Sequence, residues 1–313
     1  FCVHLFGELP GALFATQFKP TINVVLETLT SHVSQSHDLI GLLLLLKINE
    51  LLNQEMSKRK INELSDFFLS AQIVLKPKVK ELFDLNVKSI QQADAKSMFT
   101  NQTDVAPKIV TRRFAELNAS ILRIFSFGDH EDDTIRETVR RLRMEFQSLM
   151  QRIAALYSKP KSRYIFLINN YDLVLSFMEE QHLRSVQDTK SLISEEAAIF
   201  EDAVAGHTAA FVEQELLEHF SDLIALVRNA QKSRDQGTRF EISETKLRLI
   251  LRDFMSNYRV RIEHLRNNIF LEFPNLTNGM TVLKHCLAQL LNYHRRFEAI
   301  VDAVNPSLKS EMV

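Results

Sequence analysis

Residues Arg163 to Met178 read RYIFLINNYDLVLSFM, and this stretch decides the expected fold. Apolar side chains occur on every side of the helix that it would form, which is typical of a helix inside a large helical assembly or a membrane. Two amides and a carboxylate lie at its centre, Asn169, Asn170 and Asp172. A buried polar group without a partner costs on the order of 1–3 kcal/mol. The stretch therefore predicts an internal helix whose polar centre is cross-linked to neighbouring helices or loop backbones.

The composition favours an all-α fold. The chain has seven glycines and seven prolines in 313 residues, about a third of the average usage of these two residues. Sheets, tight turns and phosphate-binding loops all draw on glycine, so its scarcity predicts long helices joined by few loops. The apolar fraction of 45% leaves ample material for a core.

The spacing of apolar residues predicts roughly ten helices with mainly short connections, which would form antiparallel bundles stacked in series as an elongated rod. The polar stretch from Glu180 to Asp188 is the weakest joint by composition. We therefore expect N-terminal bundles over residues 1–184 and a C-terminal bundle over residues 185–313. In the helix expected before Gln91, Pro77 predicts a break or kink near Leu75.

Two helices carry the most regular apolar seams, with alternating spacings of three and four residues that are typical of bundle or coiled-coil packing. The first seam consists of Ile135, Val139, Leu142, Phe146, Leu149, Ile153 and Leu156. The second consists of Met280, Leu283, Leu287, Leu290, His294, Phe297, Val301 and Val304.

The sequence carries no motif for catalysis, and we expect no catalytic residue, metal, cofactor or small-molecule substrate. It contains no His-Glu-x-x-His pair, no glycine-rich phosphate loop and two cysteines only, too few for a zinc site of the usual kind. The charge is balanced, with 38 basic and 39 acidic residues, so no global field favours nucleic acid.

The longest apolar run, Leu39 to Leu46, is far shorter than the roughly 20 residues of a membrane helix. Scarce cysteine suggests a reducing compartment, in which the sequons at Asn101, Asn118 and Asn275 would be unused. The chain opens at Phe1 rather than at a methionine, so we expect it to be a fragment.

Charge is distributed unevenly along the chain. Residues 134–163 hold eight basic and two acidic side chains, whereas residues 195–222 hold eight acidic ones and no Lys or Arg. Both could be solvated faces, as we expect for the pair Glu195–Glu196, or the two could face each other across a bundle joint. Alternatively, the basic face could meet an anionic membrane or an acidic partner helix. The candidate contacts are then Arg136, Arg140, Arg143, Lys159 and Lys161.

Several phrases of the sequence resemble a known family. FLINNYDLVL, residues Phe166 to Leu175, resembles a phrase of the large helical subunits of multisubunit tethering complexes, a family that includes exocyst subunits. Four further phrases are similar to one subunit of the Golgi-associated retrograde protein complex, in the same order. They are SHDLIGLLLLLKI (36–48), LKPKVKELFDLNVKSI (75–90), IVTRRFAELNASI (109–121) and TNGMTVLKHCLAQLLNYHRRF (277–297).

This resemblance implies the C-terminal part of a non-enzymatic subunit that captures endosome-derived vesicles at the trans-Golgi network and promotes SNARE-mediated fusion. The implied partners are sister subunits, a Rab-type small GTPase, SNAREs and an anionic membrane surface. The implied location is the cytosolic face of the trans-Golgi network and endosomes. Two alternatives are a subunit of another tether such as exocyst, and an independent module that binds a small GTPase or lipid.

The resemblance also assigns expectations to residues. The matched positions Asn169, Asn170, Tyr171 and Asp172 are expected to form a structural signature rather than a ligand site. Arg112 and Arg113, in the matched TRR phrase, are expected to be surface contacts or to form local ion pairs.

Overall fold

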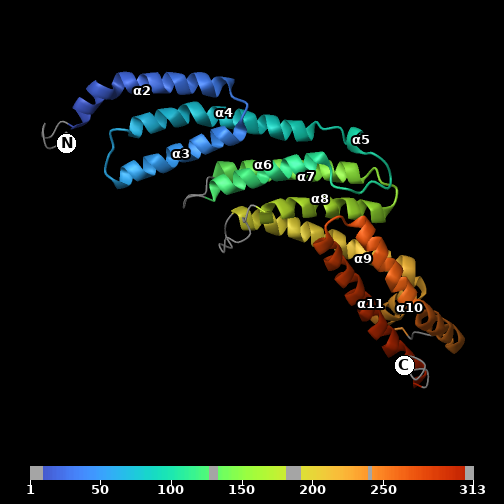
Figure 1. Ribbon diagram of the computed structural model, residues 1–313. Coiled ribbons are helices and arrows are strands. Elements are labelled where there is room, and N and C mark those ends of the chain that lie inside the picture. The colour runs from blue at the N-terminus through green and yellow to red at the C-terminus, as the bar shows by residue number, and fades with distance from the viewer. Residues whose placement is uncertain (1–9, 127–132, 181–191, 239–241, 307–313) are drawn as a thin grey trace. The chain divides into compact units, whose positions relative to one another are not determined.

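The computed structural model of the chain describes residues 10–126, 133–180, 192–238 and 242–306, which form helices and no strand (Figure 1). The all-α prediction is confirmed. The helices are α2 (Pro10–Gln35), α3 (Leu39–Lys58), α4 (Ser65–Gln91), α5 (Ala95–Met98), α6 (Ile109–Phe125), α7 (Asp133–Ala154), α8 (Pro160–Glu180), α9 (Leu192–Asp235), α10 (Glu244–Glu272) and α11 (Leu276–Val304).

Short polar side chains mark where three of these helices begin. The Asp38 carboxylate accepts a hydrogen bond from the Gly41 amide at the start of α3, at 2.9 Å. The Ser243 hydroxyl and the Asn275 amide oxygen accept bonds in the same way at the starts of α10 and α11. Each cap satisfies an amide that has no partner within its helix, which stabilises the helix by about 1 kcal/mol.

Of the break or kink predicted near Leu75, the break does not occur, because α4 continues through Pro77 from Ser65 to Gln91. Proline removes one backbone hydrogen bond and costs about 3 kcal/mol inside a helix. The neighbours Leu75 and Val79 are both buried, and burying such side chains contributes about 1.5–3 kcal/mol each. Packing on both sides of the proline therefore keeps the helix in one piece.

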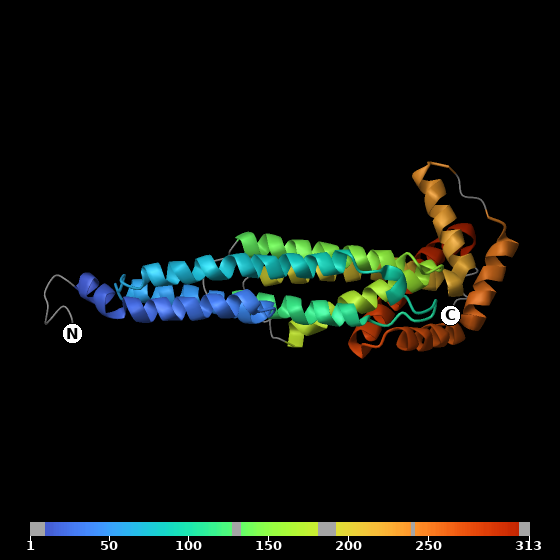
Figure 2. The same ribbon diagram turned by 90° about the horizontal axis from the view of Figure 1, so that it is seen from above.

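The helices pack into two compact units. The first comprises the described residues of 1–95, 110–149 and 176–197. In it α4 packs against both α2 and α3, and Figure 2 shows these three helices side by side. The aromatic rings of Phe114 on α6 and Phe146 on α7 stack with their centroids 4.0 Å apart. Its buried apolar residues include Leu43, Leu46, Phe68, Leu75, Phe83, Phe114, Ile121, Val139, Leu142 and Phe146.

The second unit comprises the described residues of 96–109, 150–175 and 198–313. Its core is formed by α8, α9, α10 and α11, and α10 packs on α11 after a short turn (Figure 1). The fully buried members of this core include Ile168, Phe211, Leu216, Ile224, Leu247, Leu265, Ile269, Val282, Cys286, Phe297 and Val301.

Helix α9 is interrupted at Phe220, whose backbone angles of φ −131° and ψ 34° are not helical. The side chains of Glu213 and Arg228, which stand before and after this point, form an ion pair. Fifteen residues of straight helix would separate them by about 22 Å. The interruption therefore bends α9 enough to bring the two side chains together.

The two predicted seams have different outcomes. On α7 the first six seam residues, Ile135 to Ile153, are buried as predicted, and Leu156 is half-buried. On α11 the prediction is wrong in part: Leu283, Leu290, Phe297 and Val301 are buried, but Met280, Leu287 and Val304 are exposed. The buried face of α11 is rotated toward Val282, Cys286 and Tyr293, because the core of the second unit selects one side of the apolar surface.

The predicted boundary between residues 1–184 and 185–313 falls at positions outside the described residues, and it stays a prediction. The two compact units divide the described helices differently. Each of α7, α8 and α9 contributes residues to both units.

Candidate functional site

Helix α8 is buried on most sides along its middle part, and its Ile165 and Ile168 belong to the core of the second unit. Its apolar residues Ile165, Phe166, Leu167, Ile168 and Val174 are all buried. In the part of the chain that the structure describes, no helix has the length and apolar character needed to cross a membrane. The all-round apolar surface of α8 therefore corresponds to burial in protein.

The Asn169 side chain is buried and donates two hydrogen bonds to backbone carbonyls. Its Nδ2 lies 3.1 Å from the carbonyl oxygen of Val105 and 2.9 Å from that of Glu272. Val105 belongs to the segment before α6, and Glu272 is the last residue of α10. One amide thus links α8 to a loop and to a helix end.

Asn170 is fully buried and uses its amide as both acceptor and donor. Its Oδ1 accepts a hydrogen bond from the backbone amide of Lys108 at 3.0 Å, and its Nδ2 donates to the Phe166 carbonyl at 2.7 Å. Lys108 lies directly before α6, so Asn170 supplies a partner for an amide near that helix start.

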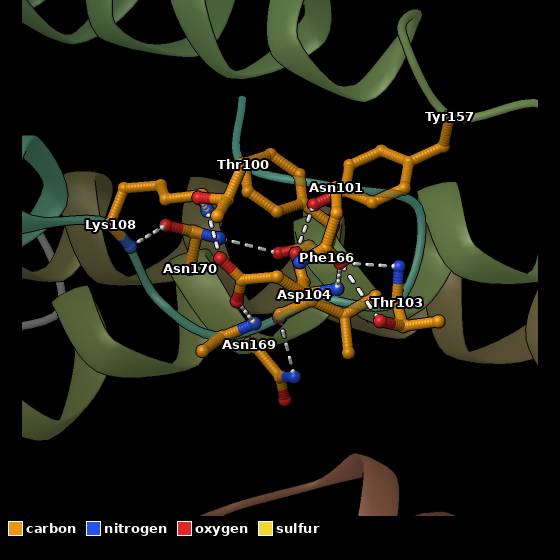
Figure 3. A network of polar contacts seen from close by, with 11 residues as sticks. Thr100, Asn101, Thr103, Asp104, Lys108, Tyr157, Phe166, Asn169 and Asn170 are labelled. Atoms are coloured by element: carbon orange, nitrogen blue, oxygen red, sulfur yellow. Dashed lines mark hydrogen bonds and ion pairs between the residues drawn. The ribbon is translucent and has the colours of Figure 1, made fainter. Parts of the chain in front are cut away.

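The segment 99–108, here called the 99–108 loop, has its own polar contacts (Figure 3). The Asn101 side-chain oxygen accepts bonds from the amides of Thr103 and Asp104, at 2.9 and 2.8 Å. The Asp104 carboxylate pairs with Lys108 Nζ at 2.8 Å, and this hydrogen bond lowers the pKa of Asp104. The Tyr157 hydroxyl donates to the Asp104 carbonyl. The loop is therefore braced from within and held against α8 by Asn169 and Asn170.

The other two residues of the expected signature have separate contacts. The Asp172 carboxylate accepts a hydrogen bond from Asn275 Nδ2 at 2.8 Å, and Asn275 also caps α11. Tyr171 is buried against the rings of Phe200 and His207. Burial raises the pKa of Tyr171 to about 12. Asn169, Asn170 and Tyr171 are thus buried, and Asp172 is half-buried beside the start of α11.

Lys161 lies near the start of α8, with its ammonium surrounded by acids. Its Nζ pairs with Glu215, and lies 3.3 Å from a Glu218 oxygen and 3.4 Å from a Glu272 oxygen. Burial alone would lower the pKa of Lys161, but these carboxylates raise it above its ordinary value. Burial raises the pKa of Glu272, and Lys161 opposes that rise. Lys161 therefore neutralises acids of its own unit.

The basic helix α7 pairs with the acidic start of α9. Arg136 pairs with Glu195, and Arg143 Nε lies 3.0 Å from Glu196. Glu196 was expected to be exposed but is buried, because Arg143 receives its carboxylate inside the first unit. Burial raises the pKa of Glu196, and Arg143 opposes that rise. These contacts agree with the interpretation in which the basic stretch 134–163 and the acidic stretch 195–222 face each other.

The remaining candidate cations are on the surface. Arg112 pairs with Glu116 at 3.0 Å and Arg140 with Glu137 at 2.7 Å, both one helical turn apart. Arg113 and Lys159 are exposed. The seven candidates therefore do not form one open basic face, since Arg143 and Lys161 are turned inward.

The three asparagines of the glycosylation sequons each have a place in the packing. Asn101 organises the 99–108 loop, and Asn275 caps α11 while it donates to Asp172. Asn118 is fully buried on α6. The first two roles follow from local patterns, since asparagine commonly bonds to the backbone two or three residues ahead.

The titratable groups of the described residues do not suggest a metal site or an activated nucleophile. Among the described residues, no three His, Cys, Asp or Glu side chains come together in a way that could hold a metal ion. Burial raises the pKa of the Cys286 thiol to about 12, so this cysteine is not a ready nucleophile. The buried clusters that do exist are ion pairs between helices.

The chain is similar to proteins of known family. A family model described as "Vps52, C-terminal" matches residues 1–200. Vacuolar protein sorting-associated protein 52 A of Arabidopsis thaliana is 32% identical over 308 residues, which cover 97% of this chain and 41% of that protein. The human vacuolar protein sorting-associated protein 52 homolog is 26% identical over 306 residues, which cover 97% of this chain and 40% of that protein. The homolog of Caenorhabditis elegans is 24% identical over 285 residues, which cover 90% of this chain and 40% of that protein. The chain thus spans about two fifths of the length of these curated relatives.

Proposed function

The chain belongs to the Vps52 C-terminal family, and from this membership we propose that it is part of a non-enzymatic subunit of a vesicle-tethering complex. The subunit would support retrograde transport from endosomes to the trans-Golgi network by capturing vesicles and promoting SNARE-mediated fusion. The observation that carries the proposal is the similarity to vacuolar protein sorting-associated proteins along 97% of the chain.

The buried chemistry is consistent with a scaffold. Ion pairs join α7 to α9 in the first unit and α8 to α9 in the second, as in Arg143–Glu196 and Lys161–Glu215. The amides of Asn169 and Asn170 join α8 to the 99–108 loop. Such contacts position helices and leave the outer surfaces for partners. We propose that the partners are sister subunits, a Rab-type small GTPase and SNAREs, at the cytosolic face of the trans-Golgi network and endosomes.

We also propose a peripheral contact with an anionic membrane. Five of the seven candidate cations pair with acids of the same chain: Arg112, Arg136, Arg140, Arg143 and Lys161. The exposed Arg113 and Lys159 remain for anionic lipid. Flotation with neutral and anionic liposomes tests this contact, and equal binding to both would contradict it.

The experiment for the main proposal is a pull-down of the intact protein that contains this chain, followed by mass spectrometry. We expect sister subunits of a Golgi-associated retrograde complex in stoichiometric amounts. Removal of the protein should delay arrival of an endosomal cargo at the trans-Golgi network, and re-expression should restore it. Recovery of exocyst subunits instead, or normal cargo arrival without the protein, would contradict the proposal.

A further inference from the structure

Helix α11 has a second apolar surface that its own unit does not cover. Leu276, Met280, Leu287 and Leu291 are 68%, 41%, 38% and 50% exposed. At 100° per residue these four positions fall within about 60° of the helix circumference. Over 15 residues the row extends for about 22 Å. We call these four residues the α11 outer stripe.

The stripe differs from scattered surface hydrophobics by its spacing. Its residues are separated by four, seven and four positions, which are heptad intervals. A narrow row at this spacing is the pattern of a seam between two helices. The adjoining Leu283 and Leu290 enter the core of the second unit, so α11 has one apolar row facing inward and a second row facing solvent.

The charge beside the stripe has one sign. From Leu276 to Phe297 the sequence contains Lys284, Arg295 and Arg296 and no Asp or Glu. Lys284 and Arg295 are exposed and lie within about 40° of the stripe on the helix circumference. Within the described ranges of the chain, no acid forms an ion pair with either of them. A partner that covers the stripe therefore gains by placing carboxylates beside these two cations.

The shape of the stripe favours a helix over a lipid surface. Helices that lie in a membrane interface present a broad apolar face, commonly with Trp, Phe or Leu. The α11 outer stripe is narrow and contains only Leu and Met. Thr277 and Asn292 lie at its open side, together with the two cations.

We propose that the α11 outer stripe is a docking surface for an amphipathic α-helix of another polypeptide, with aliphatic residues at heptad spacing and Asp or Glu beside them. This inference goes beyond the proposed function, which specifies no surface, and it does not depend on which complex contains the chain.

The test measures binding of two synthetic helical peptides to the whole chain by fluorescence anisotropy. Both peptides carry Leu at the heptad a and d positions over about three heptads, and they differ only in having Glu or Lys at the flanking e and g positions. We expect the Glu peptide to bind at least about tenfold more tightly than the Lys peptide. The variant Lys284→Glu with Arg295→Glu should reverse this preference.

Two further variants locate the binding surface. Leu287→Gln with Leu291→Gln should abolish binding of the Glu peptide without lowering the melting temperature, because both side chains are already exposed. The matched control Leu249→Gln with Val260→Gln changes two exposed apolar residues of α10 and should leave binding intact. Equal affinity for both peptides, no affinity for either, or binding that survives the Leu287 and Leu291 changes would overturn the proposal. Flotation with phosphatidylcholine or phosphatidylserine vesicles, in the absence of peptide binding, would assign the stripe to lipid and also overturn it.

Discussion

At the scale of single residues, the side-chain amides of Asn169 and Asn170 are buried polar groups of α8 that require hydrogen-bond partners. They satisfy the carbonyls of Val105 and Glu272 and the amide of Lys108, which belong to two other segments, the 99–108 loop and the end of α10. Removing a side chain that makes such bonds leaves the backbone partners buried without a bond, and that costs more than the bond itself contributes. We therefore propose a structural role for this pair.

Replacing Asn169 and Asn170 together by alanine should lower the free energy of unfolding by about 2–5 kcal/mol. The measurement is urea unfolding followed by circular dichroism at 222 nm. The matched control is Asn257→Ala with Asn292→Ala, which changes two exposed asparagines and should have an effect below about 0.5 kcal/mol. A double variant that unfolds like the wild type but loses a partner would show that the pair is a recognition site.

Residue patterns predicted that these amides need partners, but not which partners they have. Val105 and Lys108 lie more than 60 positions away in the sequence, and tertiary packing alone brings them to α8. The turn formed by Asn101, Thr103 and Asp104 is local and could have been predicted from its residues. The expectation that Glu196 is exposed is wrong, and its sequence neighbour Glu195, which has the same charge, gave no sign of this. Only the position of Arg143, which depends on tertiary packing, makes the surroundings of the two carboxylates different.

At the scale of helices, two neighbouring arginines of α7 form ion pairs in different surroundings. The Arg143–Glu196 pair is buried, with 12% and 3% of the side chains exposed. The Arg141–Asp84 pair is open, with 50% and 46% exposed. Breaking a buried pair leaves a charge without compensation, whereas an exposed pair contributes little.

Arg143→Met should destabilise the protein by about 3 kcal/mol at neutral pH, whereas the control Arg141→Met should cost less than about 1 kcal/mol. Burial already raises the folded-state pKa of Glu196 above its ordinary value of 4.5, and removal of Arg143 raises it further. A raised carboxyl pKa means stability that is present below the unfolded-state pKa and is lost as the pH rises through the folded-state pKa.

The loss in Arg143→Met should therefore shrink as the pH falls toward 4.5, measured by chemical unfolding at several pH values. The double variant Arg143→Met with Glu196→Met should regain most of the stability, because no charge is left buried. A loss that does not change with pH would mean that Arg143 acts through packing of its aliphatic stem.

Helix α4 contains a proline whose replacement should be favourable. Pro77 is exposed, and its neighbour Ile73 is 65% exposed, so no packing depends on the ring. Pro77→Ala supplies an amide for the Ile73 carbonyl and should stabilise the protein by about 1–2 kcal/mol, after the entropy gained by the unfolded chain is subtracted. Thermal unfolding of Pro77→Ala beside the control Lys76→Ala measures this effect. An unchanged melting temperature would show that α4 is already adapted to the missing bond.

The apolar seams of α7 and α11 show how well the spacing of apolar residues predicts the buried face of a helix. The α7 pattern predicts its buried face correctly, because α7 has a single apolar row among charged residues. Helix α11 has apolar residues over a wider arc, so the spacing alone cannot tell which row enters the core. The exposed Met280 and Leu287 are the result.

At the scale of the whole molecule, neither compact unit is one continuous stretch of the sequence. The second unit takes residues from 96–109 and 150–175 as well as from 198–313. Ile165 and Ile168 of α8 belong to the same buried core as Leu247 and Val282. The predicted C-terminal bundle of residues 185–313 lacks these α8 side chains.

Fragments 1–184 and 185–313, expressed separately, should therefore fail to fold into stable units, since each loses part of a shared core. We expect reduced helicity and non-cooperative thermal unfolding of residues 185–313 alone, with recovery when the two fragments are mixed. Circular dichroism and size-exclusion chromatography measure both effects. Cooperative unfolding of the isolated fragment would support the predicted domain boundary instead.

Helix content and the enclosed position of α8 could be predicted because they follow from composition and local periodicity. The membership of the units could not, because it depends on contacts between segments as far apart as Asn169 and Glu272, which are separated by 103 positions. The pairing of the basic and acidic stretches was one of several open interpretations, since charge counts do not specify orientation.

The burial of Asn118 and the bonds of Asn275 also limit how the protein can be produced. A host that attaches sugars to nascent chains acts on asparagine before the helices have packed. A glycan on Asn118 would need space inside α6 and its neighbours, where the side chain has no exposed surface. A glycan on Asn275 would replace one of the two hydrogens on the nitrogen that donates to Asp172 and would crowd this contact. Recombinant material made through a secretory route should therefore be heterogeneous and poorly folded, and Asn118→Gln alone would not repair it.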